Sequence, residues 1–134
     1  TDHTPLPARF LTPHQTQASP EAYATVVAGM RLAVTKGTAT ELNRTSYPVC
    51  GKTGTAENAG KDHSAFIGFA PMNHPKIAIA VYIEHGGFGA DMAAPIAGLI
   101  MEEYLKGRLS PRSLATVKRL ERMQTLEKRV SSTK

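Results

Sequence analysis

The most informative segment of the chain runs from Cys50 to Asn58 and reads CGKTGTAEN. Nucleotide-binding phosphate loops also contain Gly-Lys-Thr, but they need another glycine five residues before the Gly-Lys pair and a helix after it. Ser46 occupies that glycine position, and the residues after the motif are typical of a turn rather than a helix. We therefore interpret the segment as a strand that carries a Lys-Thr-Gly motif and not as a phosphate loop.

The residues of this motif suit the binding of a substrate carboxylate. Side chains alternate along a strand, so Thr53 and Thr55 share one face, opposite to Lys52. Two neighbouring hydroxyls can bind a carboxylate, the lysine adds positive charge, and Gly54 leaves room for an extended substrate along the strand. The backbone N–H of Thr55 can donate to a developing oxyanion. Spacing alone leaves a structural alternative open, in which the strand lies between turns and its lysine is solvated.

Periodicity in the rest of the chain predicts an α+β fold. Ser19 followed by Pro20 is a strong helix start, and Gly107 is a typical helix end. A short turn at 71–75 joins two strand-like runs, which predicts an antiparallel hairpin. Alternating apolar residues predict strands over 49–56, 64–70 and 76–84, and helical spacing predicts helices over 20–36, 91–107 and from 110 onward.

Two further expectations concern local structure and packing. In 76–84 the larger apolar residues share one face while Ala78 and Ala80 lie on the other, so we expect a helix to pack closely against the alanines. Residues 1–18 are rich in proline, threonine and glutamine and have no detectable period. We expect this N-terminal region to be extended.

Composition fits one globular domain and excludes several classes of function. The chain has 134 residues, of which 41% are hydrophobic, enough for a single core. Aromatic residues make up only 6% and tryptophan is absent, which argues against a base-stacking surface for nucleic acid. Cys50 is the single cysteine and the five histidines lack metal-ligand spacing, so we expect no disulfide, metal or cofactor.

The net charge of +5 is concentrated in one part of the chain. Residues 106–134 hold nine basic and two acidic residues, a net charge of +7, whereas residues 1–105 carry −2. We expect a solvated basic helix in the C-terminal part. Its alternative role is the binding of an acidic or membrane partner through Arg119 and Arg122.

The segments around the motif resemble the penicillin-binding proteins, which are serine transpeptidases with a serine β-lactamase-like fold. The resemblance covers about residues 20–107 and is greatest to the class B, elongation-type enzymes called penicillin-binding protein 2. It implies three neighbouring strands of a five-stranded antiparallel sheet, packed against helices. The matching segments are, in order, CGKTGTAEN at 50–58, HSAFIGFAP at 63–71, IAIAV at 77–81, EHGG at 84–87 and AAPIA at 93–97.

The resemblance also implies a role for each residue of the motif. Lys52 corresponds to the family lysine beside the nucleophile. The hydroxyls of Thr53 and Thr55, on either side of Gly54, would bind the carboxylate of a D-Ala-D-Ala stem peptide or of a β-lactam. The Thr55 N–H would supply half of the oxyanion hole. The implied reaction is peptidoglycan cross-linking through an acyl-serine intermediate, at the periplasmic face of the cytoplasmic membrane.

The sequence departs from the family pattern in one respect. The family places Ser-x-x-Lys and Ser-x-Asn motifs upstream of Lys-Thr-Gly, and here the only Ser-x-x-Lys match is at 131–134, downstream of it. We expect residues 1–107 to be the C-terminal part of a transpeptidase domain, residues 108–134 to be a basic helical tail, and the chain alone to be inactive. Loss of upstream strands would bare the sheet edge along 76–84, so we expect self-association.

Two alternatives to a transpeptidase stay open at this stage. One is a penicillin-recognising hydrolase, either a β-lactamase or a D,D-carboxypeptidase, and the other is a non-enzymatic interaction module that uses the basic helix. Three residues near the motif are interpreted as structural: Cys50 as a small buried strand residue, His63 as a polar residue at a strand start, and His85 as a loop residue.

Overall fold

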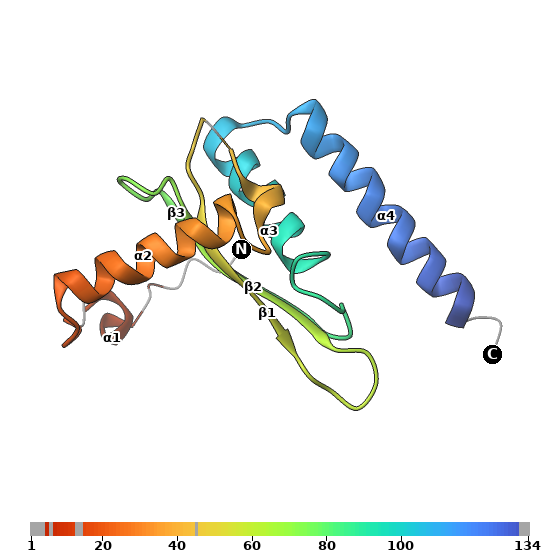
Figure 1. The fold of residues 1–134 in the computed structure, drawn as a ribbon, viewed down its shortest axis with the longest axis horizontal. Helices are drawn as coiled ribbons and strands as arrows, with labels where there is room; N and C mark the ends of the chain where they lie inside the picture. The colour runs from red at the N-terminus through yellow and green to blue at the C-terminus, as the bar shows by residue number, and fades with distance from the viewer. Residues whose placement is uncertain (1–4, 6, 13–14, 45, 132–134) are drawn as a thin grey trace.

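The computed structural model describes residues 5, 7–12, 15–44 and 46–131 of the chain, and Figure 1 shows their arrangement. The prediction of an α+β fold is confirmed, and the predicted strands and longer helices agree with the observed ones to within two residues at each described boundary. The elements follow in the order α1 (Ala8–Leu11), α2 (Pro20–Thr35), the 3-10 turn η1 (Thr40–Leu42), β1 (Cys50–Ala56), β2 (His63–Ala70), β3 (Ile77–Ile83), α3 (Ala93–Lys106) and α4 (Pro111–Ser131).

The N-terminal region differs from the expectation of an extended segment, because α1 lies within residues 1–18. Thr12 closes this single turn twice, since its backbone N–H and its hydroxyl both donate to the Ala8 carbonyl oxygen at 3.1 Å. The sequence does not predict this turn, because four residues among prolines and threonines are too few to establish a helical period.

The three strands form one antiparallel sheet in the order β1-β2-β3. Thr53 lies opposite Phe66, and Phe66 lies opposite Val81, so these three side chains share a face. β2 is the central strand of the described sheet, and β1 and β3 lie at its edges. The predicted antiparallel hairpin between β2 and β3 is confirmed.

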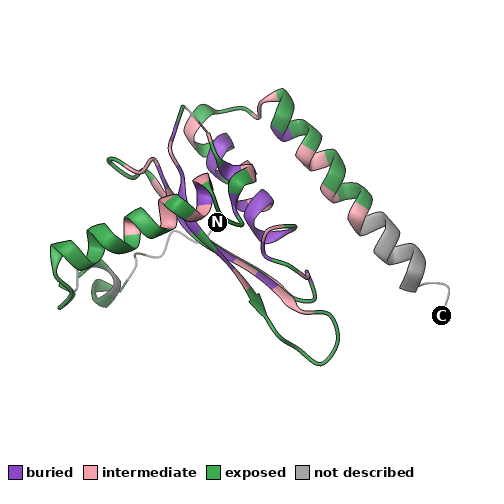
Figure 2. Cartoon of the chain, in the orientation of Figure 1, coloured by how far each residue is buried: buried purple, intermediate pink, exposed green. Residues whose placement is uncertain are grey.

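Helix α3 covers the face of the sheet that carries the branched apolar side chains of β3. Ile79 and Val81 pack against the buried core, whereas Ala78 and Ala80 are exposed. The expectation that a helix packs on the alanine face was wrong, because the isoleucine face has more apolar area to remove from water. Much of α3 is buried (Figure 2), and the small residues that allow its close approach lie on the helix itself: Ala93, Ala94, Ala97 and Gly98.

Phe66 lies at the centre of this core, between two glycines. Its side chain is 1% exposed. A Cβ atom at Gly51 would overlap the Phe66 ring, and one at Gly68 would lie 2.8 Å from it. Both positions therefore need glycine for the ring to fit against β1 and β2.

Helix α2 begins where the sequence predicts and packs against β1. The Ser19 hydroxyl accepts a hydrogen bond from the Ala22 N–H at 3.2 Å, as an N-cap does. In the second half of the helix, Arg31 Nη1 donates to the Val49 carbonyl oxygen at 2.9 Å. This bond fixes α2 to the residue that precedes β1.

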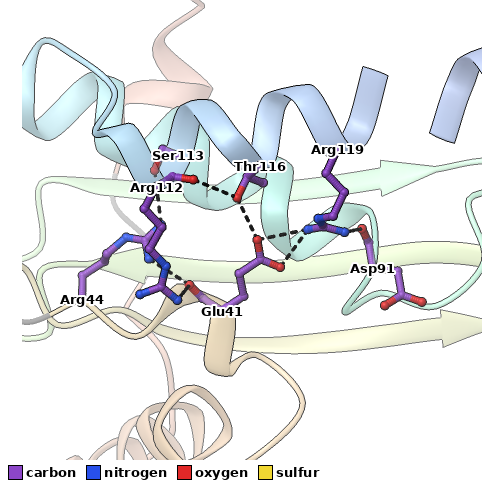
Figure 3. Close-up of polar contacts among 7 residues, drawn as sticks. All are labelled: Glu41, Arg44, Asp91, Arg112, Ser113, Thr116 and Arg119. Atoms are coloured by element: carbon purple, nitrogen blue, oxygen red, sulfur yellow. Dashed lines mark hydrogen bonds and ion pairs between the residues drawn. The ribbon is translucent and has the colours of Figure 1, made fainter. Parts of the chain in front are cut away.

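Helix α4 is attached to the rest of the chain through Glu41, which lies in η1 (Figure 3). Arg119 donates to the two carboxylate oxygens of Glu41 at 2.9 and 3.0 Å, and the Thr116 hydroxyl donates to Oε1 at 3.0 Å. These contacts join the predicted basic tail to the predicted transpeptidase part, and the division of the chain at residue 107 stays a prediction.

A buried carboxylate lies at the junction of α3 and α4. The Ser113 hydroxyl donates to the Glu102 carboxylate, and both side chains are buried. Burial alone raises the pKa of Glu102, but hydrogen bonds from Ser113 and Ser110 and the charge of Arg44 outweigh it, so the pKa lies below its ordinary value.

None of the helices in the described part of the chain is both long enough and apolar enough to cross a membrane.

Candidate functional site

The Lys-Thr-Gly motif lies on β1, an edge strand of the described sheet. The register places Thr53 and Thr55 on the face that α3 covers and Lys52 on the opposite face. Within the described residues β1 pairs only with β2, so alternate backbone N–H and C=O groups of β1 point away from the sheet. Such groups can pair with an extended ligand.

The two threonines of the motif differ in their surroundings. Thr53 is only 9% exposed, and its Oγ1 lies 2.6 Å from Oγ1 of Thr38, which follows α2. Thr55 is exposed. One hydroxyl therefore has a protein partner and the other faces solvent. Sequence reasoning missed Thr38, because no periodic pattern links a turn residue to a strand residue fifteen positions later.

The Lys52 ammonium group folds back on its own strand. Its Nζ donates to the Thr53 carbonyl oxygen at 2.6 Å, and the side chain is exposed. An ammonium group has three N–H donors, so this bond leaves two for a ligand or a neighbouring hydroxyl. The positive charge of the motif thus lies beside the strand edge.

The loop between β3 and α3 lies directly on the backbone of the sheet. A Cβ atom at Gly89 would overlap the carbonyl oxygens of Gly54 and Ala65, so only glycine allows this contact. The buried Ser64 hydroxyl holds the same loop, because it donates to the Phe88 carbonyl oxygen at 3.1 Å. The loop therefore supports the motif strand on the face of the sheet that carries Ser64.

The same serine also fixes the start of α3. The Ala93 N–H donates to the Ser64 hydroxyl at 3.0 Å, which satisfies one of the amide groups that a helix leaves unpaired at its N-terminus. Ser64 lies opposite Thr55 in the sheet. Sequence reasoning missed this serine, because a polar residue on a strand gives no sign of which distant amide it will bind.

His63 and His85 form a hydrogen-bonded pair at the end of the sheet. His63 Nδ1 accepts from the His85 backbone N–H at 2.9 Å, and the two ring centroids are 4.9 Å apart. His85 has a left-handed backbone with φ of 54°, and its Nδ1 lies 3.1 Å from the Lys61 carbonyl oxygen. These contacts support the structural interpretation of both histidines.

Cys50 is buried at the start of β1. Burial raises the pKa of its thiol, and the charge of Arg31 opposes this only in part. Because the thiolate is the reactive form of cysteine, this thiol is a poor nucleophile.

In the part of the chain that the structure describes, no group of three or more His, Cys, Asp or Glu side chains could hold a metal ion.

The face of the sheet opposite α3 is apolar and largely open. Ile67 and Tyr82 lie on it and are 57% and 60% exposed. Met30 of α2 borders a shallow hollow on the same face, together with Ala78 and Ala80. Contiguous exposed apolar surface of this kind marks a place where further protein or a ligand packs.

The resemblance to penicillin-recognising serine enzymes implies three neighbouring antiparallel strands packed against helices, and the structure has this arrangement, with the Lys-Thr-Gly motif on β1. Comparison with known families agrees with this class. Residues 11–102 match the penicillin binding protein transpeptidase domain. Because the match covers more than half of the chain, the chain belongs to this family.

Curated relatives include several peptidoglycan D,D-transpeptidases. The enzyme MrdA of Haemophilus influenzae is 36% identical over a match that covers 48% of this chain and 12% of that enzyme. The enzyme PbpA of Mycobacterium tuberculosis is 40% identical over 44% of this chain and 14% of that enzyme. The match therefore spans about an eighth of the length of these relatives.

Solved structures show the same fold. Penicillin-binding protein 2 of Pseudomonas aeruginosa, solved in complex with WCK 5153, has a TM-score of 0.63 and 36% identity, and the match covers 74% of this chain and 23% of that one. Penicillin-binding protein A of M. tuberculosis, solved as an imipenem acyl-enzyme complex, has a TM-score of 0.59 and 34% identity over 66% of this chain and 20% of that one. The predicted fold and the resemblance to penicillin-binding protein 2 are confirmed.

Proposed function

We propose that this chain is the carboxylate-recognition part of a peptidoglycan D,D-transpeptidase that cross-links stem peptides through an acyl-serine intermediate and binds penicillins. The D-Ala-D-Ala end of a stem peptide, or a β-lactam, lies along the open edge of β1. The hydroxyls of Thr53 and Thr55 bind its carboxylate, and Gly54 leaves space for its backbone. The Thr55 N–H donates to the oxyanion that forms when the serine attacks.

One observation carries this proposal: Lys52, Thr53, Gly54 and Thr55 lie together on β1, which among the described residues pairs with β2 alone and so leaves its other edge unpaired. A transpeptidase must hold an extended peptide by its backbone and by its terminal carboxylate, and this edge offers groups for both. The family match and the D,D-transpeptidases among the relatives support the same reaction class.

The nucleophile is assigned to residues outside this chain. A serine nucleophile needs a positioned base, and the sequence holds no Ser-x-x-Lys upstream of the motif. In the proposal, the nucleophile-bearing element packs on the open face of the sheet, which carries Lys52 and the exposed Ile67 and Tyr82. The lysine then supports the hydrogen bonds around the serine, and this chain alone has no turnover.

The alternatives are weaker for different reasons. A β-lactamase or D,D-carboxypeptidase needs the same strand chemistry, but the curated relatives named here are transpeptidases. The interaction-module alternative depends on Arg119, whose guanidinium already binds Glu41 within the chain. Because stem peptides are cross-linked outside the cytoplasm, we place the whole protein at the periplasmic face of the cytoplasmic membrane, anchored by residues outside this chain.

The test is covalent labelling of the full-length gene product with a fluorescent penicillin, followed by peptide mapping. We expect stable label on a serine outside residues 1–134, with loss of label in Lys52→Ala and retention in Lys36→Ala. Lys36 is the matched control, because it is an exposed lysine at the end of α2. Absence of label on the folded protein overturns the transpeptidase proposal, and rapid hydrolytic release of the label favours the hydrolase alternative.

A further inference from the structure

In the described part of the chain, the side chain that hydrogen-bonds to the Thr53 hydroxyl is the hydroxyl of Thr38. Their Oγ1 atoms are 2.6 Å apart, the distance of a strong hydrogen bond between two hydroxyls. Thr53 is nearly buried whereas Thr38 is exposed, so the protein shields the Thr53 end of this bond from water. The contact thus fixes the rotation of the one motif hydroxyl that is not open to solvent.

The backbone around Thr38 is itself held firmly. It follows α2, where the Ala39 N–H donates to the Ala33 carbonyl oxygen at 3.1 Å. A Cβ atom at Gly37 would lie 2.8 Å from Ala33 Cα, so glycine is needed for the chain to fold back on the helix at this point. The turn therefore presents the Thr38 hydroxyl to β1 from a fixed position.

A hydroxyl has one proton to donate and two lone pairs to accept with. If Thr53 donates its one proton to a carboxylate, it cannot also donate to Thr38. In the bond between the two threonines, Thr38 must then be the donor and Thr53 the acceptor. Donation by Thr38 also polarises the Thr53 hydroxyl and strengthens its own donated bond. The pair thus forms a chain of two hydrogen bonds, in which Thr38 donates to Thr53 and the proton of Thr53 stays available to an anion.

We propose that Thr38 is a positioning residue of the carboxylate site: it donates to Thr53 and thereby directs the Thr53 proton toward the carboxylate of the stem peptide or β-lactam. This inference rests on the proposed function of Thr53. It predicts that Thr38 affects ligands with a free carboxylate and does not affect ligands in which that group is an ester.

The experiment measures the second-order rate of acylation of the full-length protein by a penicillin and by its methyl ester. We expect Thr38→Val to slow acylation by the free acid about tenfold, the effect of one lost hydrogen bond, and to change acylation by the ester less than about twofold. Thr38→Ser keeps a hydroxyl and restores most of the rate. Thr40→Val is the matched control, because Thr40 is exposed and only two residues away.

The outcomes separate this inference from the proposal on which it rests. If Thr53→Val does not change the ratio of acid to ester rates, the proposed role of Thr53 is wrong. If Thr53→Val changes that ratio and Thr38→Val does not, only the role of Thr38 is overturned. An equal loss for acid and ester in Thr38→Val shows a merely structural role. In the double variant Thr38→Val/Thr53→Val, we expect no further loss beyond that of Thr53→Val.

Discussion

Replacement of Glu41 by glutamine tests how α4 is held. Glu41 accepts two hydrogen bonds from Arg119 and one from Thr116. Glutamine keeps one oxygen but loses the charge and the second acceptor. The side chains of Arg119 and Glu41 are 42% and 34% exposed, so we discount their ion pair to about 0.5–1 kcal/mol. Weakening of the Thr116 bond adds about 0.5 kcal/mol. The expected loss is thus about 1–1.5 kcal/mol.

A loss of this size increases the detached population of α4 by about five- to thirteenfold. Hydrogen exchange read by mass spectrometry measures it directly, because detached helices exchange their amide protons. We expect peptides from the first half of α4 to exchange faster by this factor in Glu41→Gln, while peptides from β1 to β3 stay unchanged. The control is Glu103→Gln, which removes an exposed carboxylate from α3 and should leave α4 as it is.

Two results would refute this reasoning. Unchanged exchange in α4 would mean that other contacts, such as the buried Ser113–Glu102 hydrogen bond, and not Glu41, hold the helix. A uniform increase over the whole chain would mean that α4 and the sheet unfold together. High salt provides a further check, because it screens exposed ion pairs. Salt should accelerate exchange of α4 in the wild type and have a smaller effect in Glu41→Gln.

Three further predictions concern stability and reactivity. Gly51→Ala should lower the free energy of unfolding in urea by about 1–3 kcal/mol, because the added Cβ overlaps the buried Phe66 ring; a change below about 0.5 kcal/mol would show that the ring has room to move. The pKa of Glu102 is lowered by folding, so its stabilisation is present above the ordinary value of 4.5 and is lost as pH falls below it. Ser113→Ala removes a hydrogen bond that lowers the pKa of Glu102. Circular dichroism should therefore show that the variant unfolds in acid at a higher pH than the wild type does. Cys50 should react with a disulfide reagent at pH 8 much more slowly in the folded chain than in urea, since burial raises its pKa; equal rates would contradict the burial of the thiol.

Periodic features of the fold could be predicted from the sequence. Alternation along β1 placed Thr53 and Thr55 on one face and Lys52 on the other, and the register agrees. The helix start at Ser19 and Pro20 was equally predictable from the sequence, because N-cap preferences are local. Each of these features depends on neighbours within a few residues, so composition and spacing are enough.

Features that join distant residues could not be predicted. The bond between Thr38 and Thr53 and the attachment of α4 to Glu41 depend on which loops meet in space. The expectation of a helix against Ala78 and Ala80 was wrong, because the small residues at the contact between sheet and helix belong to α3. Patterns of size identify a close approach but do not say which of the two surfaces supplies the small side chains.

The contact of Gly89 with the backbone of Gly54 and Ala65 has a mechanical consequence for the motif strand. Elsewhere between sheet and helix, side chains form a deformable spacer, and a substitution is absorbed by changes of rotamer. At this point two backbones touch with nothing between them, so an added atom has to displace one of them. The position of the Lys-Thr-Gly strand therefore depends on a residue without a side chain, and a single methyl group added at 89 would push the loop and the strand apart while every side chain of the motif stays the same.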